Sequence, residues 1–320
     1  MTRIAKGVCC CFAVVISTAA DEPATDTLAP DGTSFSPAPV PRPAGPLVEK
    51  VRVLAAESRI PSAEAFLEML RNPRPSPVEL VPVSTSPMRV NDLARHAASA
   101  HLRVGWVYRC SKCSNWHTSL AGGYAIAPDT VVTAFHVLET SPQDMLPGTG
   151  FPIIVRGDND IIAITAAVDA DPRTDTMILR VSSKDLPALP LAEKIEVGDA
   201  VYCLSDPFEQ RGIFTAGIVN CLDGHAEGSG DKTAGRRLIV STDWAPGSSG
   251  SAILDSCGNV VGHVDTVQTF ASKKKPARDG KSTTEPLPAV LTLHFAVPAS
   301  NVRTLLESHS ETNFRASPKS

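Results

Sequence analysis

Short apolar runs alternate with polar turn segments from about residue 92 onward. Runs such as TVVTAFHVL, TMILRVSS and RRLIVSTD are rich in Val, Ile and Leu, and turn-forming segments such as APDT, RGDND and DSCGN separate them. The runs recur about every 8–15 residues, and no long helical pattern stands between them. Many short strands of this kind predict an all-β fold, either an antiparallel sandwich or a barrel.

The segment ahead of these strands has a different composition. Residues 21–91 are rich in Pro, Ala, Ser and Thr, which predicts an extended linker or pro-segment with little buried surface. One short helix is predicted within it at 61–71, because the apolar residues share one face and Ser62 can cap the first turn. A second helical pattern, DLARHAASA, opens the domain that we assign to 92–309.

The last part of the sequence predicts a helix and a tail. PASNVRTLLESH follows the final apolar run and predicts a closing helix at 298–308. Residues 310–320 are polar and are expected to form a disordered tail.

The first residues have the order of a secretory signal. Arg3 and Lys6 precede the apolar run VCCCFAVVI, and the small residues STAA follow it. We therefore predict a signal peptide at 1–20 and export to the periplasm or the extracellular space. The apolar run has nine residues, whereas about 20 are needed to cross a bilayer, so we expect no stable membrane anchor.

Composition and charge describe an ordinary globular protein. The 320 residues are 42% hydrophobic and 20% charged, and the formal net charge is −4. A weakly acidic chain without a basic stripe gives no reason to expect nucleic-acid binding. We expect no cofactor, and the oligomeric state stays open.

The cysteines that follow the predicted signal are candidates for disulfides. Three of the eight lie in the signal, and an oxidising compartment permits bridges among the other five. We expect a hairpin whose turn lies near 207–211 to bring Cys203 and Cys221 together as a disulfide.

The sequence CSKC offers a second candidate pair, Cys110 and Cys113. These two residues can form a disulfide, or they can join His117 as three quarters of a zinc site. No fourth ligand is evident nearby, so we expect no metal.

Three residues stand beside apolar runs where packing alone does not explain them. His136 follows VVTAF, Asp175 precedes TMILRV, and Ser249 lies in GSSGS. Taken singly, each is more typical of a structural residue. Together they supply a hydroxyl nucleophile, a base and a carboxylate that orients the base, in the chain order of one class of serine hydrolase. The rival Gly-x-Ser-x-Gly elbow fits less well, because GSSGS ends in Ser and follows its His.

The motifs around these residues resemble those of the chymotrypsin-like serine proteases, and within them the HtrA-type bacterial branch. VVTAFHVLE is similar to the segment around the base, DTMILRV to that around the acid, and STDWAPGSSGSAIL to that around the nucleophile. VGDAVYCLSDPF, TAGIVN and LHFAVPASNV resemble three further segments, and the resemblance covers about residues 100–308. It implies two six-stranded antiparallel β-barrels, at about 100–190 and 191–297, followed by the C-terminal helix.

The resemblance also implies a role for each candidate residue. Ser249 would be the nucleophile, His136 its base, and Asp175 the acid that orients the base. The oxyanion hole would consist of the backbone N–H groups of Gly247 and Ser249. We expect the protease domain alone, without the C-terminal PDZ module that this family usually carries.

Several positions near the nucleophile depart from the family's pattern. Ser251 replaces a glycine, and the loop between Asp243 and Gly247 is shorter, so the family's substrate preference cannot be carried over. Asp243 and Asp265 are weak candidates for the substrate pocket, and for Asp243 we favour the role of a loop aspartate.

The residue before the nucleophile bears on activation. Ser248 has no charge to pair with an N-terminus freed by cleavage, and burying an unpaired ammonium is costly. We therefore expect 21–91 to be a tether or spacer rather than an activation peptide, so that a chain starting near residue 90 keeps full turnover.

These observations favour an exported serine endopeptidase that acts on polypeptide substrates. The main alternative is a catalytically silent pseudoprotease that binds protein partners, and a further one is a hydrolase that uses the same triad on another bond.

Overall fold

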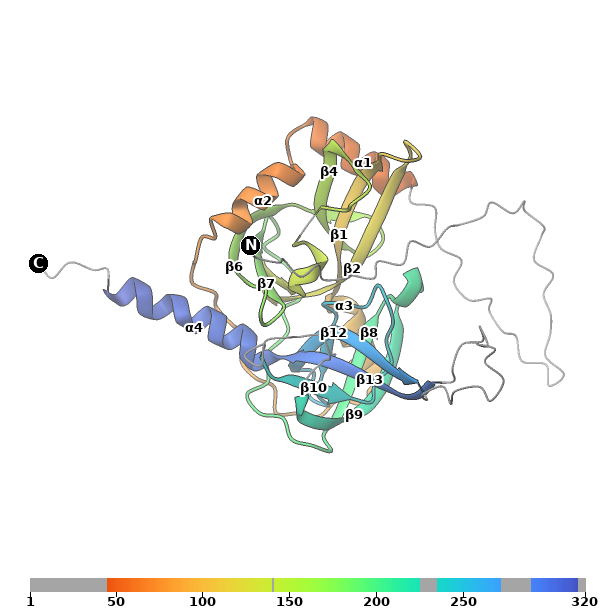
Figure 1. Ribbon diagram of the computed structural model, residues 1–320. Coiled ribbons are helices and arrows are strands. Elements are labelled where there is room, and N and C mark those ends of the chain that lie inside the picture. The colour runs from red at the N-terminus through yellow and green to blue at the C-terminus, as the bar shows by residue number, and fades with distance from the viewer. Residues whose placement is uncertain (1–44, 140, 225–234, 272–288, 316–320) are drawn as a thin grey trace, which may run out of the picture. The chain divides into compact units, whose positions relative to one another are not determined.

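Two antiparallel sheets make up most of the described chain. The computed structural model describes residues 45–139, 141–224, 235–271 and 289–315 (Figure 1). The predicted signal at 1–20 lies outside these residues. The all-β prediction is confirmed, since within these residues helices occur only before the first strand and after the last, apart from two short 3-10 turns.

The first sheet contains seven strands. In spatial order they are β5 (Asp160–Ile162), β4 (Met145–Arg156), β1 (His101–Cys110), β2 (Trp116–Ala127), β3 (Thr130–Thr133), β7 (Thr176–Val181) and β6 (Ile164–Asp171). The sequence predicted a closed six-stranded barrel here, whereas this sheet has seven strands and its two end strands, β5 and β6, are not paired with each other in the described residues. The additional strand is β5, which forms a hairpin with β4 through Gly157 at φ 58°, a conformation that suits glycine.

The second sheet closes into the predicted six-stranded barrel. Its strands, in order around the barrel, are β10 (Arg237–Val240), β13 (Ala289–Pro298), β12 (Val260–Ala271), β11 (Ala252–Leu254), β8 (Ala200–Ser205) and β9 (Ile213–Gly224). Closure leaves this sheet without an open edge.

A separate apolar cluster joins the two sheets. Each sheet has its own core, built for example around Trp106 in the first sheet and Ile253 in the second. Between them, Tyr124 of β2 packs in one cluster with Leu204 of β8 and Leu254 of β11. The next residue of β2, Ala125, points the other way and belongs to the core of the first sheet, because successive side chains of a strand point to opposite faces.

Three helices precede the strands, where the sequence predicted two. α1 (Gly45–Ala56) was not expected, α2 (Ala63–Arg71) matches the helix predicted at 61–71, and α3 (Val90–Ala100) covers the second helical pattern. Ser62 caps α2, as expected, because its side-chain oxygen accepts a hydrogen bond from the backbone N–H of Ala65, the third residue of the helix.

The first two helices pack on the first sheet (Figure 1). Val51 of α1 and Phe66 of α2 are fully buried, and the ring of Phe66 meets that of Trp106 edge-on at 5.9 Å. The interpretation of 21–91 as a tether is therefore wrong for its part from residue 45 onward. Its apolar residues are spaced for a helix and contribute to the core.

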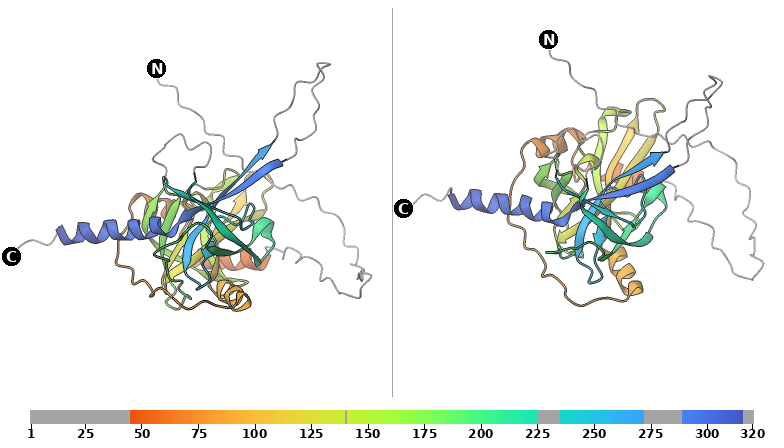
Figure 2. Two further views of the ribbon diagram at one scale, coloured as in Figure 1. Left: turned by 90° about the horizontal axis from the view of Figure 1, so that it is seen from below. Right: turned by 60° about the horizontal axis from the view of Figure 1, so that its bottom comes forward.

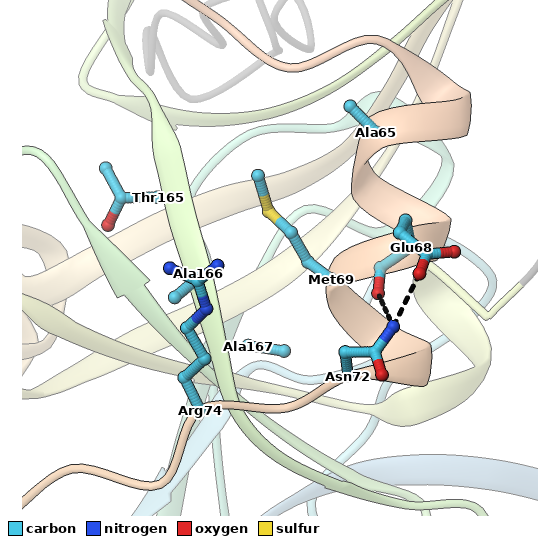
Figure 3. A pocket seen from close by; sticks show the side chains of 8 residues that line it. All are labelled: Ala65, Glu68, Met69, Asn72, Arg74, Thr165, Ala166 and Ala167. Carbon is cyan, nitrogen blue, oxygen red and sulfur yellow. Dashed lines mark hydrogen bonds between the residues drawn. The ribbon is translucent and has the colours of Figure 1, made fainter.

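Part of the sheet's edge beside α2 stays uncovered. A hollow of about 380 Å³ lies between the helix and β6, with Met69 pointing toward the strand and the Arg74 side chain running along it beside Ala166 (Figure 3). Asn72 ends the helix and donates from its side-chain nitrogen to the carboxylate of Glu68.

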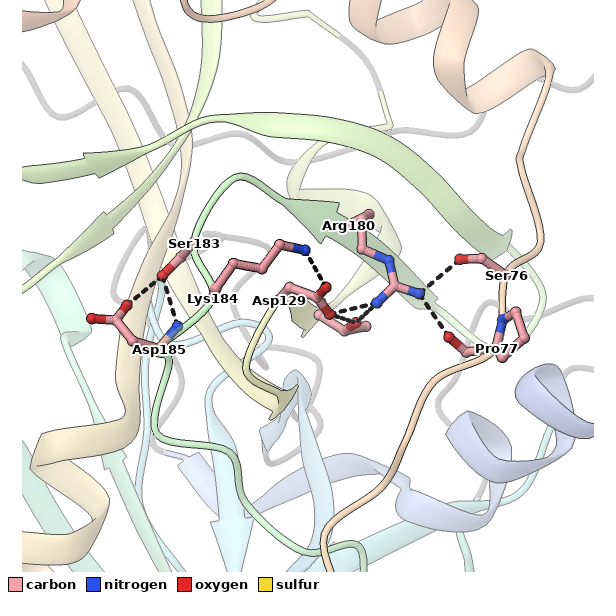
Figure 4. A network of polar contacts seen from close by, with 8 residues as sticks. Ser76, Pro77, Asp129, Arg180, Ser183, Lys184 and Asp185 are labelled. Carbon is pink, nitrogen blue, oxygen red and sulfur yellow. Dashed lines mark hydrogen bonds and ion pairs between the residues drawn. The ribbon is translucent and has the colours of Figure 1, made fainter.

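The proline-rich segment after α2 is bound to the first sheet. The guanidinium of Arg180, on β7, donates to Ser76 Oγ at 2.7 Å and to the carbonyl of Pro77 at 3.0 Å (Figure 4). The same side chain pairs with Asp129. Lys184 and Arg180 together lower the pKa of Asp129 to about 2.

Further along, the same segment reaches the second barrel. Asn259 exchanges two hydrogen bonds with the backbone of Ser84, at 2.8 and 2.9 Å, and the Met88 N–H donates to the carbonyl of Ser256. Residues 76–88, which we call the strap, therefore connect the two sheets on the way to α3 (Figure 2).

The closing helix is longer than predicted. α4 runs over Ala299–Arg315 and continues into the segment expected to be a tail (Figures 1 and 2). Its first turns are anchored by the buried residues Ala299 and Val302, and helix propagation adds one hydrogen bond for each further residue. None of the helices in the described ranges has the length and apolar character needed to cross a membrane.

The packing of α1 can be tested with one substitution at two positions. Val51 is fully buried and Val53 is 47% exposed on the same helix. We expect Val51→Ala to lower the free energy of unfolding by about 2 kcal/mol, from lost burial and the cavity left behind. Val53→Ala should change it by less than about 0.5 kcal/mol. Urea unfolding measures both, and equal values would show that α1 does not pack on the sheet.

Candidate active site

His136 and Asp175 form the best-defined polar contact at the junction of the two sheets. His136 lies in a 3-10 turn, η1 (Phe135–Val137), directly after β3, and Asp175 immediately precedes β7. The His136 backbone N–H donates to Asp175 Oδ1, and its Nδ1 donates to Oδ2, both at 2.9 Å. Because β3 and β7 are paired neighbours, the sheet itself brings together residues that are 39 positions apart.

Burial and charge act in opposite directions on this pair. Burial is the largest influence on His136 and favours its neutral form, but the hydrogen bond and charge of Asp175 outweigh it, so the pKa of His136 is raised. Burial would raise the pKa of Asp175, but its bonds to His136 prevail and lower it. The imidazole is 42% exposed and the carboxylate 11%, so solvent or a ligand can reach the base.

The backbone at Asp175 is held in an uncommon conformation. Its φ is 55°, in the left-handed region that residues with a side chain seldom adopt. Two contacts hold its carbonyl: the Phe135 N–H donates to it at 3.2 Å, and His263 Nε2 donates at 3.1 Å. The aspartate is therefore fixed from both sides.

His263 is a bridge that the sequence did not reveal. It lies fully buried on β12, where Nε2 binds the Asp175 carbonyl and Nδ1 faces the Tyr124 hydroxyl at 3.4 Å. This arrangement fits a neutral ring with its proton on Nε2. Burial lowers the pKa of His263 to about 4.

A second carboxylate lies close to the pair. Asp265 offers an oxygen within 4.8 Å of the ligand atoms of His136 and Asp175. Arg237 Nε donates to it at 2.5 Å, and both side chains are nearly buried. Burial and the Asp175 charge raise the pKa of Asp265. Asp265, a weak candidate for the substrate pocket, thus stands beside the imidazole.

The side chains of His136, Asp175 and Asp265 are close enough to share a metal ion, but each carboxylate already has a partner. Asp175 accepts a hydrogen bond from His136, and Asp265 accepts one from Arg237. The arrangement therefore resembles two linked ion pairs more than an open set of ligands.

Ser249 lies in a loop packed against the first sheet. The Gly122 N–H of β2 donates to the Ser249 carbonyl at 2.7 Å. The neighbouring Gly250 is so close to Thr133 and Ala134 that a Cβ there would lie 2.4–2.8 Å from their atoms. Ala134 comes two residues before His136, so the loop packs against the segment that leads into His136.

The loop's own hydrogen bonds keep it in shape. The Ser248 N–H donates to the Ala245 carbonyl, the Ser251 N–H to that of Ser248, and the Gly250 N–H to that of Val264. Among the described residues, no partner accepts from the N–H groups of Gly247 and Ser249. Two donors of one short loop are therefore available to an incoming group.

Gly247 is required by a neighbouring turn. It has φ 99°, and a Cβ on it would lie 2.8 Å from the Asp206 carbonyl in the turn before η2 (Pro207–Glu209). The Phe208 N–H donates to the Pro246 carbonyl at 2.8 Å, which attaches this turn to the loop. Asp206 in turn faces His101, the first residue of β1, at 3.3 Å.

The other pocket candidate, Asp243, faces solvent. Its side chain is 86% exposed, and its carboxylate lies 3.9 Å from His294 Nε2. This position fits a loop aspartate better than a buried pocket carboxylate. The adjacent Trp244 is buried, packs edge-on against His294 at 5.0 Å, and donates its indole N–H to the Thr266 carbonyl.

The predicted Cys203–Cys221 disulfide is wrong. In the hairpin of β8 and β9, Cys203 is paired with Thr215. Cys221 is instead paired with Ile239 of β10, the other neighbour of β9 in the barrel. Six residues of strand, roughly 20 Å, separate Thr215 from Cys221. A turn centred near 209 pairs position 203 with 215, so the predicted register was in error. Burial raises the pKa of the Cys203 thiol to about 12.

The other candidate pair, Cys110 and Cys113, consists of two free thiols in this structure. They lie together with His117 at the tip of the β1–β2 hairpin.

Part of the chain matches a known protein family. Residues 121–262 match the family described as trypsin-like peptidase domain. A "Probable periplasmic serine endoprotease DegP-like" of Pseudomonas putida is 33% identical over 149 residues, which cover 45% of this chain and 28% of the relative. The protein of the same name from Chlamydia pneumoniae is 28% identical, with 44% and 27% covered. The chain thus spans less than a third of the length of these relatives.

Two solved structures are also similar to the chain. One is the serine endoprotease from Yersinia pestis, at 20% identity and a TM-score of 0.47, with 70% of this chain and 67% of that chain covered. The other is the HtrA-type protease AlgW with a tripeptide, at 22% identity and a TM-score of 0.49, with 69% and 63% covered.

The buried His263 gives a prediction for stability against pH. The pKa of this ring is depressed to about 4, so only the unfolded chain takes up its proton as the pH falls from about 6.5 to 4. Stability present above pH 6.5 is therefore lost in that window, by up to about 3 kcal/mol. Urea unfolding at pH 7 and pH 5 should show a smaller loss for His263→Gln than for the parent.

His96→Gln, on α3, is the control for a histidine that does not connect the sheets. If His263→Gln and the parent lose the same free energy between pH 7 and pH 5, the ring is not held neutral in the folded state.

Proposed function

We propose that the chain is a trypsin-like serine endopeptidase of the HtrA type, which hydrolyses peptide bonds in polypeptide substrates. The observation that carries the proposal is the double hydrogen bond between His136 and Asp175, beside a loop that carries Ser249 and two unused N–H donors. A nucleophile, a base and an oriented carboxylate are the parts that acyl transfer needs.

In the proposed reaction, Ser249 Oγ attacks the carbonyl carbon of the substrate while its proton passes to His136 Nε2. The C–N bond then breaks, and His136 gives the proton to the departing amine. Water hydrolyses the resulting ester by the same route. Asp175 fixes the tautomer, because its bond to Nδ1 leaves Nε2 as the acceptor. These steps use side chains of this chain and water.

The charge that develops on the substrate oxygen needs donors that are already in position. We assign this role to the N–H groups of Gly247 and Ser249, which have no acceptor among the described residues. The left-handed conformation of Gly247 and the contact of its loop with the turn at Asp206 support this geometry. Losing one such donor costs on the order of 10²–10³ in rate in related sites.

We also propose that the protein is exported. The relatives in Pseudomonas putida and Chlamydia pneumoniae are named periplasmic, and the order of charges and apolar residues at 1–20 is that of a signal peptide. Detection of the mature chain in a periplasmic or culture-medium fraction, with an N-terminus near residue 21, tests this.

Two experiments distinguish the proposal from its alternatives. Labelling by a fluorophosphonate probe separates a working hydrolase from a catalytically silent binding protein. Digestion of a peptide library then separates a peptidase from a hydrolase of other bonds. A chain that binds peptides but neither reacts with the probe nor cleaves the library would refute the proposal.

The nucleophile can be tested against its neighbour. Ser249→Ala should lower turnover by about 10⁶, the size of loss seen when a triad nucleophile is removed, and should abolish probe labelling. Ser248→Ala is the matched control, because among the described residues the hydroxyl of this buried residue makes only one long contact, 3.5 Å from the Ala245 N–H. It should keep turnover within about tenfold. A Ser249→Ala enzyme with more than a few per cent of parent activity contradicts the assignment.

The two carboxylates near His136 predict a shift in the pH profile. Activity requires the neutral imidazole, so turnover should rise with pH through the pKa of His136, which lies above its usual value of about 6.5. Asp265→Asn removes a negative charge that favours the imidazolium. The midpoint should therefore move to lower pH, by about one unit.

Glu139→Gln serves as the control for this shift, because Glu139 is exposed and has a weaker effect on the same ring. Its midpoint should move less. An unchanged or higher midpoint in Asp265→Asn, measured in protein that unfolds at the parent's temperature, would show that the second carboxylate does not act on the base.

A further inference from the structure

Residues 110–117 form the tip of the β1–β2 hairpin and gather three metal-binding side chains. The Cys110 N–H donates to the Asn115 carbonyl at 2.8 Å, and the Ser114 N–H donates to the Cys110 carbonyl at 3.0 Å. Ser114 has φ 59°, which turns the chain back toward β2. As a result Cys113, inside the turn, faces His117, one residue into the second strand.

The distances suit one ion held by all three side chains. The two sulfurs and a ring nitrogen of His117 all lie within 4.8 Å of one another, and Cys113 Sγ is 3.0 Å from His117 Nε2. Around a tetrahedral zinc ion with bonds of about 2.0–2.3 Å, ligand atoms stand roughly 3.5–3.8 Å apart. Small rotations of exposed side chains would bring the cluster to that spacing.

The spacing of the two cysteines also suits a metal. Cys110 and Cys113 are separated by two residues, a spacing that is typical of zinc-binding turns. A thiolate, rather than a thiol, is the ligand.

An aromatic side chain on the neighbouring strand holds the His117 ring in place. Tyr108, on β1, stacks on His117 with ring centroids 5.8 Å apart and planes 25° apart. The two residues are paired across the hairpin, so the stacking is part of the strand register. A ring fixed in this way loses less freedom on binding an ion.

We propose that Cys110, Cys113 and His117 bind one Zn²⁺ ion, with a fourth coordination position open to water. Binding releases the two thiol protons. The sequence alone favoured no metal, because no fourth ligand is near, but three protein ligands and a water make a complete tetrahedral site. His117 and Gly122 are five residues apart on β2, roughly 17 Å, so this site is separate from the one around Ser249.

The rival use of the same two cysteines is a disulfide. Zinc and a bridge exclude each other, because a disulfide leaves no thiolate to bind the ion. The state of the thiols in the exported protein therefore decides between them.

The test is metal content and cobalt absorption of the full chain. After incubation with Zn²⁺ and gel filtration, the parent should carry one zinc per chain. Cys113→Ser and His117→Ala should bind at least tenfold more weakly. Cys257→Ser, which removes a half-buried thiol outside the cluster, should bind like the parent. With Co²⁺ in place of Zn²⁺, the parent should show a thiolate-to-cobalt charge-transfer band that Cys113→Ser weakens.

Three results overturn the proposal: no stoichiometric zinc in the parent, equal zinc affinity in Cys113→Ser, or a Cys110–Cys113 disulfide in protein isolated from the compartment to which it is exported. Alkylation before and after reduction, followed by mass measurement, detects the last of these. Thermal unfolding of both variants without metal shows whether a loss of binding is separate from a loss of fold.

Discussion

The contact between β2 and the loop that carries Ser249 is the constraint on which the rest of the structure depends. Gly122 donates to the Ser249 carbonyl, and a Cβ on Gly122 would lie 2.0 Å from Ser251 Oγ. The sequence pattern that the chain resembles has glycine where Ser251 stands. The side chain added at Ser251 fills the space that Gly122 leaves empty, so the backbones of the two sheets can still meet. Without that approach, Ser249 and the His136–Asp175 pair would not be held at one junction.

Other devices hold the same junction, and they differ in strength. His263 joins the second barrel to the Asp175 carbonyl, and the strap is bound to Arg180 of one sheet and Asn259 of the other. The apolar cluster around Tyr124 adds buried area between the sheets. Buried hydrogen bonds contribute about 1 kcal/mol each, whereas an apolar cluster contributes in proportion to its area. The cluster therefore keeps the sheets together, and the polar contacts set their alignment.

The sequence sufficed for features that are local in the chain. The all-β class follows from the spacing of apolar runs, and His136, Asp175 and Ser249 could be proposed as a site because short motifs surround each of them. Features that depend on register were missed. The Arg237–Asp265 pair spans two strands that are not hydrogen-bonded neighbours, and the Cys203–Cys221 prediction failed by six residues of register. Helix α1 was overlooked because proline-rich flanks obscured a helical spacing of buried residues.

The residues that the sequence did not reveal, Arg237 and His263, take part in setting the pKa of His136 or surround it without adding charge. An imidazole between two carboxylates would hold its proton too firmly to act as a base near neutral pH. Arg237 offsets one of the two negative charges, and burial of the ring disfavours the charged form further. His263 adds no charge, because its own burial keeps it neutral. The basicity of His136 is thus a balance among groups from both sheets, and each group is positioned by the same junction that positions Ser249. The geometry of the proposed triad and the pKa of its base are therefore consequences of one interface.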